Sequence, residues 1–293
     1  MVLADLMNPF SQRFAVLVIF FLLFPGLAAA GEPGDWRPLF NGKDLDGWET
    51  YLGPPHAPVA GLNLRKNSKG KYVEPVGLNN DPTGVYRLVQ EDGAPAIRIS
   101  GEIFGALTSL EEFENYHLRL ETKWGKKKWP PREDRVRDSG LLYHCIGEHA
   151  AGSPYWLKSF ECQIQENDVG DFWPVAGVIV DVEGIKADET LLTFQKGGTP
   201  YQGWTRRIVR NPRSEKPSGE WNTVEIYVLG QTAVHVSEGK TNMILTGLRR
   251  QVGGQEKPLT RGRIQIQSEG AEVFYRNIMI RPISDIPDAV LLQ

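Results

Sequence analysis

The stretch SFECQIQEND, residues 159–168, decides which fold this sequence predicts. Successive side chains of a β-strand point to opposite faces. On that pattern Glu161, Gln163 and Gln165 share one face, and Cys162 and Ile164 share the other. In an antiparallel sandwich one face of a strand packs in the core, while the other meets solvent or bounds a cleft. The polar face of this strand therefore predicts either a solvated surface or a cleft.

Similar runs recur along the chain and are separated by Gly, Pro or Asn-Asp clusters. Long helical periodicity is lacking, and at most one short helix is expected, in LEEFENYHLR (residues 110–119). Many short alternating strands with turn signals predict an all-β fold, an antiparallel sandwich or jelly roll. The other runs are GVYRLVQ, AIRISG, GALTSL, YHLRLETKW, GLLYHCI, AGVIVDV, NTVEIYVLG, TAVHVSE, NMILT, GRIQIQSEG and VFYRNIMI.

The N-terminal segment has the features of a secretory signal peptide. Arg13 precedes the apolar run FAVLVIFFLLFPGLAAA, which ends in small residues, so cleavage is expected before Gly31. An uncleaved N-terminal anchor is the alternative. We therefore expect residues 1–30 to be removed and residues 31–293 to form a single secreted or periplasmic domain without a membrane span.

Composition and net charge argue against one class of binding partner, nucleic acids. The chain has 293 residues, a formal net charge of -3 and a pI of about 6.0. A nucleic-acid-binding domain would need a clearly basic stripe, so no nucleic-acid partner is expected. Two segments near 53–82 and 125–138 interrupt the strand pattern and are expected to be long surface loops.

The two cysteines, Cys145 and Cys162, lie in two neighbouring strand-like runs. If these strands pair antiparallel with Cys145 opposite Cys162, the same register sets His144 opposite Gln163. Directly opposed residues can approach closely enough for a disulfide, which an oxidising compartment would allow. A Cys145–Cys162 disulfide is therefore expected, with two reduced core cysteines as the alternative.

Six motifs in order resemble one family. They are WRPLFNGKDLDGW, YHLRLETKW, RDSGLLYHC, FECQIQEND, GEWNTVEI and GRIQIQSEGAEVFYRNIMIRPI, which together span residues 36–282. This pattern is similar to that of the 3-keto-disaccharide hydrolase domain family. The resemblance implies a β-sandwich of the concanavalin A-like lectin/glucanase type, and an enzyme that cleaves the glycosidic bond of 3-keto-disaccharides or related glycosides.

The sequence departs from the family pattern at three positions. His144 stands where the family commonly has Arg, Glu166 where it has Asp, and Glu238 where it has Asn. The two inserted loops are also longer than the family pattern suggests. These departures leave the sugar and its linkage open.

The alternation of four strands offers polar side chains to what is expected to be one surface. Sugars suit such a surface, because hydroxyl groups need fixed donors and acceptors and ring faces need aromatic partners. The plain alternative is a solvated sheet face with ordinary ion pairs. The residues expected to bind substrate are Gln163, Gln165, Glu121, Gln267, Glu269 and Trp124.

The chemistry that the resemblance implies is elimination followed by hydration. A ketone at C3 acidifies the hydrogen on C2, so a base can remove it and the oxygen at C1 can leave. Glu161 is expected to be the base, and His144 the acid, the electrophile or a metal ligand. Lys123 is expected to stabilise the enolate. Glu121 and Glu269 are the reserve carboxylates.

Alternatives remain open at the sequence level. A retaining glycosidase needs two carboxyl groups about 5–5.5 Å apart, but Gln163 occupies the second position on the strand face. No metal motif is present among the five His, although a divalent ion on His144 and Glu161 is a further option. A non-catalytic, lectin-like carbohydrate-binding module on the same sandwich is the competing function.

Overall fold

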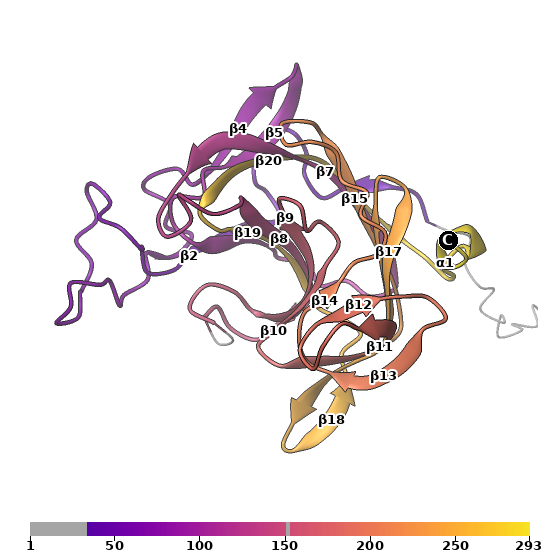
Figure 1. Cartoon of the computed structure of the whole chain (residues 1–293). Coiled ribbons are helices and arrows are strands. Elements are labelled where there is room, and N and C mark those ends of the chain that lie inside the picture. The colour runs from indigo at the N-terminus through magenta and orange to yellow at the C-terminus, as the bar shows by residue number, and fades with distance from the viewer. Residues whose placement is uncertain (1–33, 151–152) are drawn as a thin grey trace, which may run out of the picture. The chain divides into compact units, whose positions relative to one another are not determined.

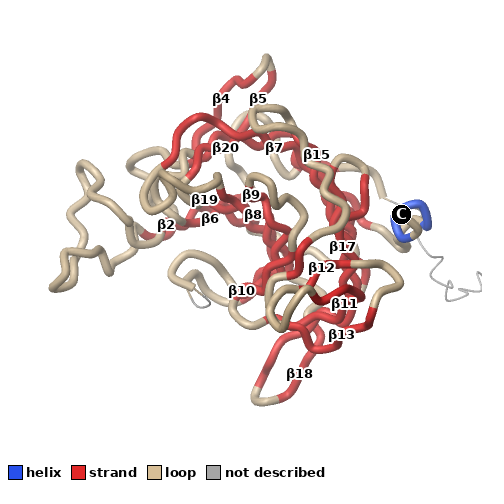
Figure 2. Tube along the Cα trace, viewed as in Figure 1, coloured by secondary structure: helices blue, strands red, loops and turns tan. Residues whose placement is uncertain are grey.

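The structure is a computed structural model that describes residues 34–150 and 153–293. The expected signal peptide, residues 1–30, lies outside the described residues. Among the described residues, no helix combines the length and the apolar character needed to cross a membrane. The domain from residue 34 onward is almost entirely built of β-strands joined by loops (Figure 2).

The domain consists of two sheets, with the outer sheet curving around the inner one (Figure 1). The order of the outer sheet is β4 (Tyr86–Glu91), β5 (Ala94–Ile99), β20 (Ala271–Pro282), β7 (Tyr116–Lys128), β15 (Asn222–Leu229), β16 (Thr232–Ser237) and β17 (Lys240–Val252). The short strand β1 (Arg37–Pro38) pairs with the far end of β20.

The inner sheet is broader and carries the strand on which the sequence argument rests, β9. Its order is β3 (Gly77–Leu78), β2 (Trp48–Leu52), β6 (Gly105–Ser109), β19 (Arg263–Ser268), β8 (Asp138–Ile146), β9 (Lys158–Gln165), β10 (Phe172–Val175), β14 (Ile208–Val209), β12 (Leu192–Phe194), β11 (Val178–Lys186) and β13 (Thr199–Trp204). These pairings are antiparallel except β12 with β14. The predicted all-β antiparallel sandwich is confirmed.

Side-chain alternation explains why the two sheets pack face to face. On β7, Leu118 and Leu120 are fully buried in the main core, whereas Arg119 between them is exposed. Tyr143 and Phe160 of the inner sheet belong to the same core. Burying apolar surface of this kind contributes roughly 25 cal/mol per Å², which is the main force that holds two sheets together. The core therefore takes up one face of each sheet and leaves the other face free.

The remaining elements close the edges of the sandwich. β11 also pairs with β17, which joins the inner sheet to the outer sheet, and β18 (Gln255–Pro258) forms a hairpin with the end of β17. The helix α1 (Asp288–Leu291) follows β20. Residues 110–119, where at most one short helix was expected, form no helix: Asn115 has φ +50 and β7 begins at Tyr116.

The two segments expected to be loops agree with the structure to different degrees. Residues 53–82 are mostly loop, interrupted by β3. The second segment is shorter than expected, because β7 continues to Lys128 and β8 begins at Asp138. The connecting loop therefore spans residues 129–137, and it delivers Arg132 to the inner sheet.

Candidate functional site

The pairing of β8 with β9 differs from the register expected from the sequence. Gly140, not His144, is opposite Gln163, and Leu141 is opposite Cys162. The ladder is regular only as far as Tyr143, where the register shifts before Ile146. A bulge adds a residue to one strand and redirects the side chains beyond it. The expected register is wrong already in the regular part of the ladder, where residue 140 takes the place expected for residue 144, and the bulge then changes the face of the residues beyond it.

The expected disulfide is also wrong, because the register places Leu141 opposite Cys162 and the bulge then turns Cys145 to the other face. Cys145 and Cys162 are both free and buried. Cys162 belongs to the main core between the sheets, whereas Cys145 packs with Leu142 and Leu157 in a separate small cluster. The bulge at residue 144 thus places the two thiols on opposite faces of the inner sheet.

We call the inner-sheet face that points away from the core the site face. The residues that share the orientation of Glu161 in the strand registers include Tyr51, Asp138, Gly140, Leu142, Gln163, Gln165, Trp173, Gln265 and Gln267. Glu161 is only 5% exposed, and Gln163 and Gln267 are also buried. The polar face of β9 is therefore not a solvated surface.

Three carboxyl groups meet on the site face around one arginine. Arg132 reaches over from loop 129–137 and forms ion pairs with Asp138 and Glu269. Asp138 also accepts a hydrogen bond from Gln165 Nε2 at 2.7 Å, and Glu161 is hydrogen-bonded to Gln267. We call Arg132, Asp138, Glu161 and Glu269 the acid cluster.

The pKa values of this cluster are shifted in a direction that matters for proton transfer. Burial raises the pKa of Glu161 well above its ordinary value, and the charges of Glu269 and Asp138 raise it further. Burial, together with Glu269, also raises the pKa of Asp138 well above the ordinary range. Burial raises the pKa of Glu269, which Arg132 partly offsets. Three buried carboxyl groups beside one guanidinium thus keep their protonated forms to higher pH than exposed carboxyl groups would.

A glycine creates the space that the acid cluster uses. Gly140 lies between Glu161 and Gln267, and a Cβ atom at this position would lie 2.1 Å from Glu161 Oε1 and 2.5 Å from Gln267 Oε1. Both distances are shorter than van der Waals contact. A side chain at position 140 would therefore displace the Glu161 carboxyl group.

Acceptor atoms without partners gather at the same place. Among the described residues, no hydrogen-bond donor reaches Asp138 Oδ1, Gln163 Oε1 or Gln267 Oε1, although all three atoms are buried. Buried acceptors without donors cost free energy, so a ligand that donates hydrogen bonds to these three atoms would be favoured. The hydroxyl groups of a sugar are donors of the kind that these oxygens lack.

Aromatic rings border the acid cluster on the loop side. The Tyr155 hydroxyl group lies 3.2 Å from His56 Nε2, and the ring of Phe104 lies 5.4 Å from that of Tyr155. Burial raises the pKa of Tyr155, and the nearby charge of Glu269 adds to this effect. The site face thus combines buried acids with aromatic surface, which is the usual composition of a carbohydrate site.

Five of the expected site residues are brought together, and four are not. Glu161, Gln163, Gln165, Gln267 and Glu269 lie on or beside the acid cluster. His144 points into the core instead: its ring contacts Tyr116, Tyr143 and Phe160, and burial lowers its pKa to about 4. Its positive φ of 50 marks the bulge that turns it away from the site face.

Lys123 and Glu121 lie on the outer face of the outer sheet. Lys123 forms ion pairs with Glu91 and Asp92, and Glu121 accepts a hydrogen bond from Arg276 Nε at 2.7 Å. The core between the sheets separates both side chains from Glu161. The sequence argument placed them with Glu161 because alternation gives the face of each strand but not the sheet to which the strand belongs.

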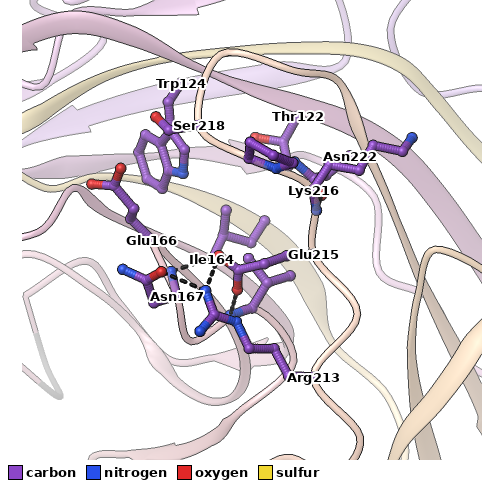
Figure 3. A pocket seen from close by; sticks show the side chains of 12 residues that line it. Thr122, Trp124, Ile164, Glu166, Asn167, Arg213, Glu215, Lys216, Ser218 and Asn222 are labelled. Atoms are coloured by element: carbon purple, nitrogen blue, oxygen red, sulfur yellow. Dashed lines mark hydrogen bonds and ion pairs between the residues drawn. The ribbon is translucent and has the colours of Figure 1, made fainter.

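Trp124 lines a different pocket, of about 370 Å³, at the end of the sandwich (Figure 3). Figure 3 shows Trp124 beside Ser218 and Glu166, with Arg213 and Glu215 at the opposite side. The Glu166 carboxylate is bound to Arg137 Nη1 at 3.0 Å, and Glu215 accepts a hydrogen bond from the Asn167 backbone at 2.6 Å. Most charged side chains of this pocket are already paired, so we do not assign the chemistry to it.

Two residues of the acid cluster were missed by the sequence argument. Asp138 was taken as the end of a loop, and Arg132 as one of many charges in that loop. A signal for Asp138 did exist, because it continues the alternation of Gly140 and Leu142 on β8. Nothing local to Arg132 predicts that its side chain folds back onto Glu269.

A divalent ion on His144 and Glu161 is not favoured by the geometry, because the two side chains lie on opposite faces of the inner sheet. Among the described residues, no group of three or more His, Cys, Asp or Glu side chains is arranged to hold a metal ion.

Comparisons with known proteins agree with the sequence motifs. A family model described as a 3-keto-alpha-glucoside-1,2-lyase-like domain matches residues 35–281. A comparison with curated protein sequences finds no significant match.

Solved structures with a similar arrangement of strands share little sequence with this chain. A protein from Parabacteroides distasonis, provisionally described as a glycosyl hydrolase, has 17% identity and a TM-score of 0.47, over 85% of this chain and 94% of its own. A Bacillus subtilis protein of unknown function with a galectin-like fold has 10% identity and a TM-score of 0.44, over 87% and 99%. The β-glucanase of Bacillus licheniformis has 9% identity and a TM-score of 0.38, over 87% and 99%. At these values the structures say nothing about the substrate of this chain.

Proposed function

The chain belongs to the 3-keto-alpha-glucoside-1,2-lyase-like family, and on this premise we propose that its site face cleaves the glycosidic bond of 3-keto-glycosides. The observation that carries the proposal is the buried Glu161 carboxyl group, whose pKa is raised within a cluster of three acids and one arginine. A base with a raised pKa is matched to proton transfer near neutral pH.

The reaction begins at C2 of the keto sugar. Glu161 takes the C2 proton, and the electron pair of the C–H bond forms an enolate with the C3 ketone. The enolate collapses and expels the oxygen at C1, which leaves a double bond between C1 and C2. Water then adds its oxygen to C1, C2 regains a proton, and the free 3-keto sugar is released.

The other members of the acid cluster have supporting roles. Arg132 is the cation nearest to the carboxyl groups, so it replaces Lys123 as the group that stabilises negative charge on the enolate oxygen. Asp138 or Glu269, in a protonated state, supplies the proton for the departing oxygen. Gln163 and Gln267 orient sugar hydroxyl groups through their unpartnered oxygens.

A panel of substrates tests the proposal. The purified protein is incubated with 3-keto-glycosides and with the matching plain glycosides, with and without a chelator. Release of sugar from the keto compounds alone is expected. Cleavage of the plain glycosides would contradict the elimination mechanism, and loss of activity with chelator would add a metal ion to it.

Carbohydrate binding without catalysis is the second candidate, and the amide side chains and aromatic rings of the site face favour it. Binding of a 3-keto-glycoside without release of sugar would establish this alternative. The protein is proposed to act after export, and N-terminal sequencing of the secreted chain is expected to begin at or near Gly31.

A further inference from the structure

Trp173 differs from its neighbours on the inner sheet. Phe172, which precedes it on β10, and Glu161, which lies opposite it on β9, are buried, whereas Trp173 is 39% exposed. A large aromatic side chain left open to solvent loses the free energy that burial would supply. Such exposure beside a buried polar site is typical of a surface that binds a ligand.

The strand register places Trp173 next to the proposed base. Trp173 of β10 is directly opposite Glu161 of β9, and Phe172 is opposite Cys162. Because Phe172 and Cys162 are buried in the main core, Trp173 and Glu161 share the site face. Directly opposed side chains have Cβ atoms about 4.5–5.5 Å apart, so the indole ring borders the Glu161 carboxyl group.

Arg207 holds the indole ring in place. Its guanidinium carbon lies 5.6 Å from the centre of the Trp173 ring, within the range of a cation–π contact. Arg207 Nε donates a hydrogen bond of 2.7 Å to Asp171 Oδ2, and Asp171 is fully buried. Asp171 thus fixes Arg207, and Arg207 in turn restrains the indole ring. A restrained aromatic ring loses little entropy when a ligand stacks on it.

From these contacts we infer that Trp173 is a stacking platform for a second sugar ring, the neighbour of the ring that reacts at Glu161. Neighbouring strands lie about 4.8 Å apart, so a ring whose C2 contacts Glu161 leaves Trp173 to the adjoining ring. The substrate is then a 3-keto-glycoside whose other unit is itself a ring, such as a disaccharide, rather than one with a small alkyl group. This inference rests on the proposed function.

Kinetics on two substrates test the platform. The ratio of kcat/KM for a 3-keto-disaccharide to that for the methyl 3-keto-glucoside is measured for the protein and for Trp173→Ala. Loss of one aromatic stacking contact is expected to lower this ratio by about 3- to 10-fold. Trp173→Phe should restore most of it, because a ring remains. An unchanged ratio in Trp173→Ala would overturn the inference.

Trp221→Ala is the matched control. Trp221 stacks with Arg276, whose guanidinium carbon lies 3.8 Å from the ring centre, and it also contacts Lys123, on the outer face of the outer sheet. The same indole is removed far from Glu161, so the substrate ratio should not change. An equal fall of the ratio in Trp221→Ala would show a general effect of tryptophan loss and would contradict the assignment to Trp173.

A binding measurement separates this inference from the proposed function. If the protein cleaves neither keto substrate, the proposed function fails, and calorimetry then decides the role of Trp173. Maltose, cellobiose and trehalose are titrated into the protein, Trp173→Ala and Trp221→Ala. Weaker binding in Trp173→Ala alone supports the platform. Equal binding in all three proteins, or no binding of any disaccharide, overturns it.

Discussion

Gly140 lies so close to Glu161 that a Cβ atom on the glycine would be 2.1 Å from Oε1 of the carboxyl group. The atoms that a larger residue would meet are the ends of two flexible side chains, Glu161 and Gln267, not backbone. The strand can therefore tolerate an alanine, but the carboxyl group cannot keep its position.

The variant Gly140→Ala is expected to fold and to lose activity. A proton-transfer group moved by about 1 Å can lose on the order of 100-fold in rate. The loss should appear in kcat with the thermal unfolding midpoint little changed. In a Glu161→Gln background the same alanine should cost almost nothing more, because both changes act on one carboxyl group. If the losses of kcat in the two single variants add fully in the double variant, Gly140 does not act through the Glu161 carboxyl group.

Replacing Arg132 by glutamine is expected to move the pH dependence of the reaction. The positive charge of Arg132 lowers the pKa of Glu161, so its removal must raise that pKa further. The rise of kcat/KM with pH, which reports ionisation of the base, should then occur at higher pH. Arg132→Lys keeps the charge, so its pH profile of kcat/KM should stay closer to that of the unmodified protein. An unchanged pH profile of kcat/KM in Arg132→Gln would show that Arg132 does not affect the pKa of Glu161.

The stability of the protein is expected to depend on Glu161 in a defined pH window. Because the pKa of Glu161 is raised in the folded state, its favourable contribution is complete below the ordinary glutamate pKa. This contribution is lost as the pH rises through the folded value. Each unit of difference between the folded and unfolded pKa corresponds to about 1.4 kcal/mol. Glu161→Gln should therefore gain stability relative to the unmodified protein as the pH rises above the ordinary glutamate pKa.

Glu121→Gln is a control for that measurement, because its effect on stability should change with pH in the opposite direction. Arg276 and Asn277 hydrogen-bond the Glu121 carboxylate and lower its pKa against the opposing effect of burial. Its contribution to stability is present above the ordinary glutamate pKa and is lost as the pH falls. Urea unfolding measured on either side of the ordinary glutamate pKa should therefore show Glu121→Gln losing relative stability as the pH rises through that value. If both variants follow the same trend, the raised pKa of Glu161 is not the cause.

The two cysteines are expected to be reduced. Cys145 and Cys162 lie on opposite faces of the inner sheet, and both are free in the structure. Alkylation of the denatured, unreduced protein should add two labels per chain by mass spectrometry. Recovery of a peptide linked through both cysteines would contradict the register of β8 and β9.

Much of the fold was predictable, because alternation and turn residues mark the strands locally. The run at residues 159–165 became β9 with Phe160 and Ile164 in the core and Glu161 and Gln163 on the other face. The part that failed is the register of β8 against β9, which alternation leaves undetermined, together with one bulge. The bulge at His144 changes the register and the face of every residue after it, and no periodic pattern encodes it.

The site was only partly predictable for a related reason. Glu161, Gln163 and Gln165 were found because they lie on one strand, and Gln267 and Glu269 because they follow the same alternation. Lys123 and Glu121 were misplaced because alternation does not say which sheet a strand joins. Arg132 was missed because a long side chain from a loop contacts the site through tertiary structure alone.

The most direct test of the account is the turnover number of Glu161→Gln on a 3-keto-disaccharide. The exchange is nearly isosteric and retains hydrogen bonding, so the variant should still fold and bind the substrate. Loss of a general base should lower kcat by about 100- to 10,000-fold while KM changes little. A Glu161→Gln protein that retains the normal kcat would contradict the central claim, and Glu269 and Asp138 would then be the carboxyl groups to test.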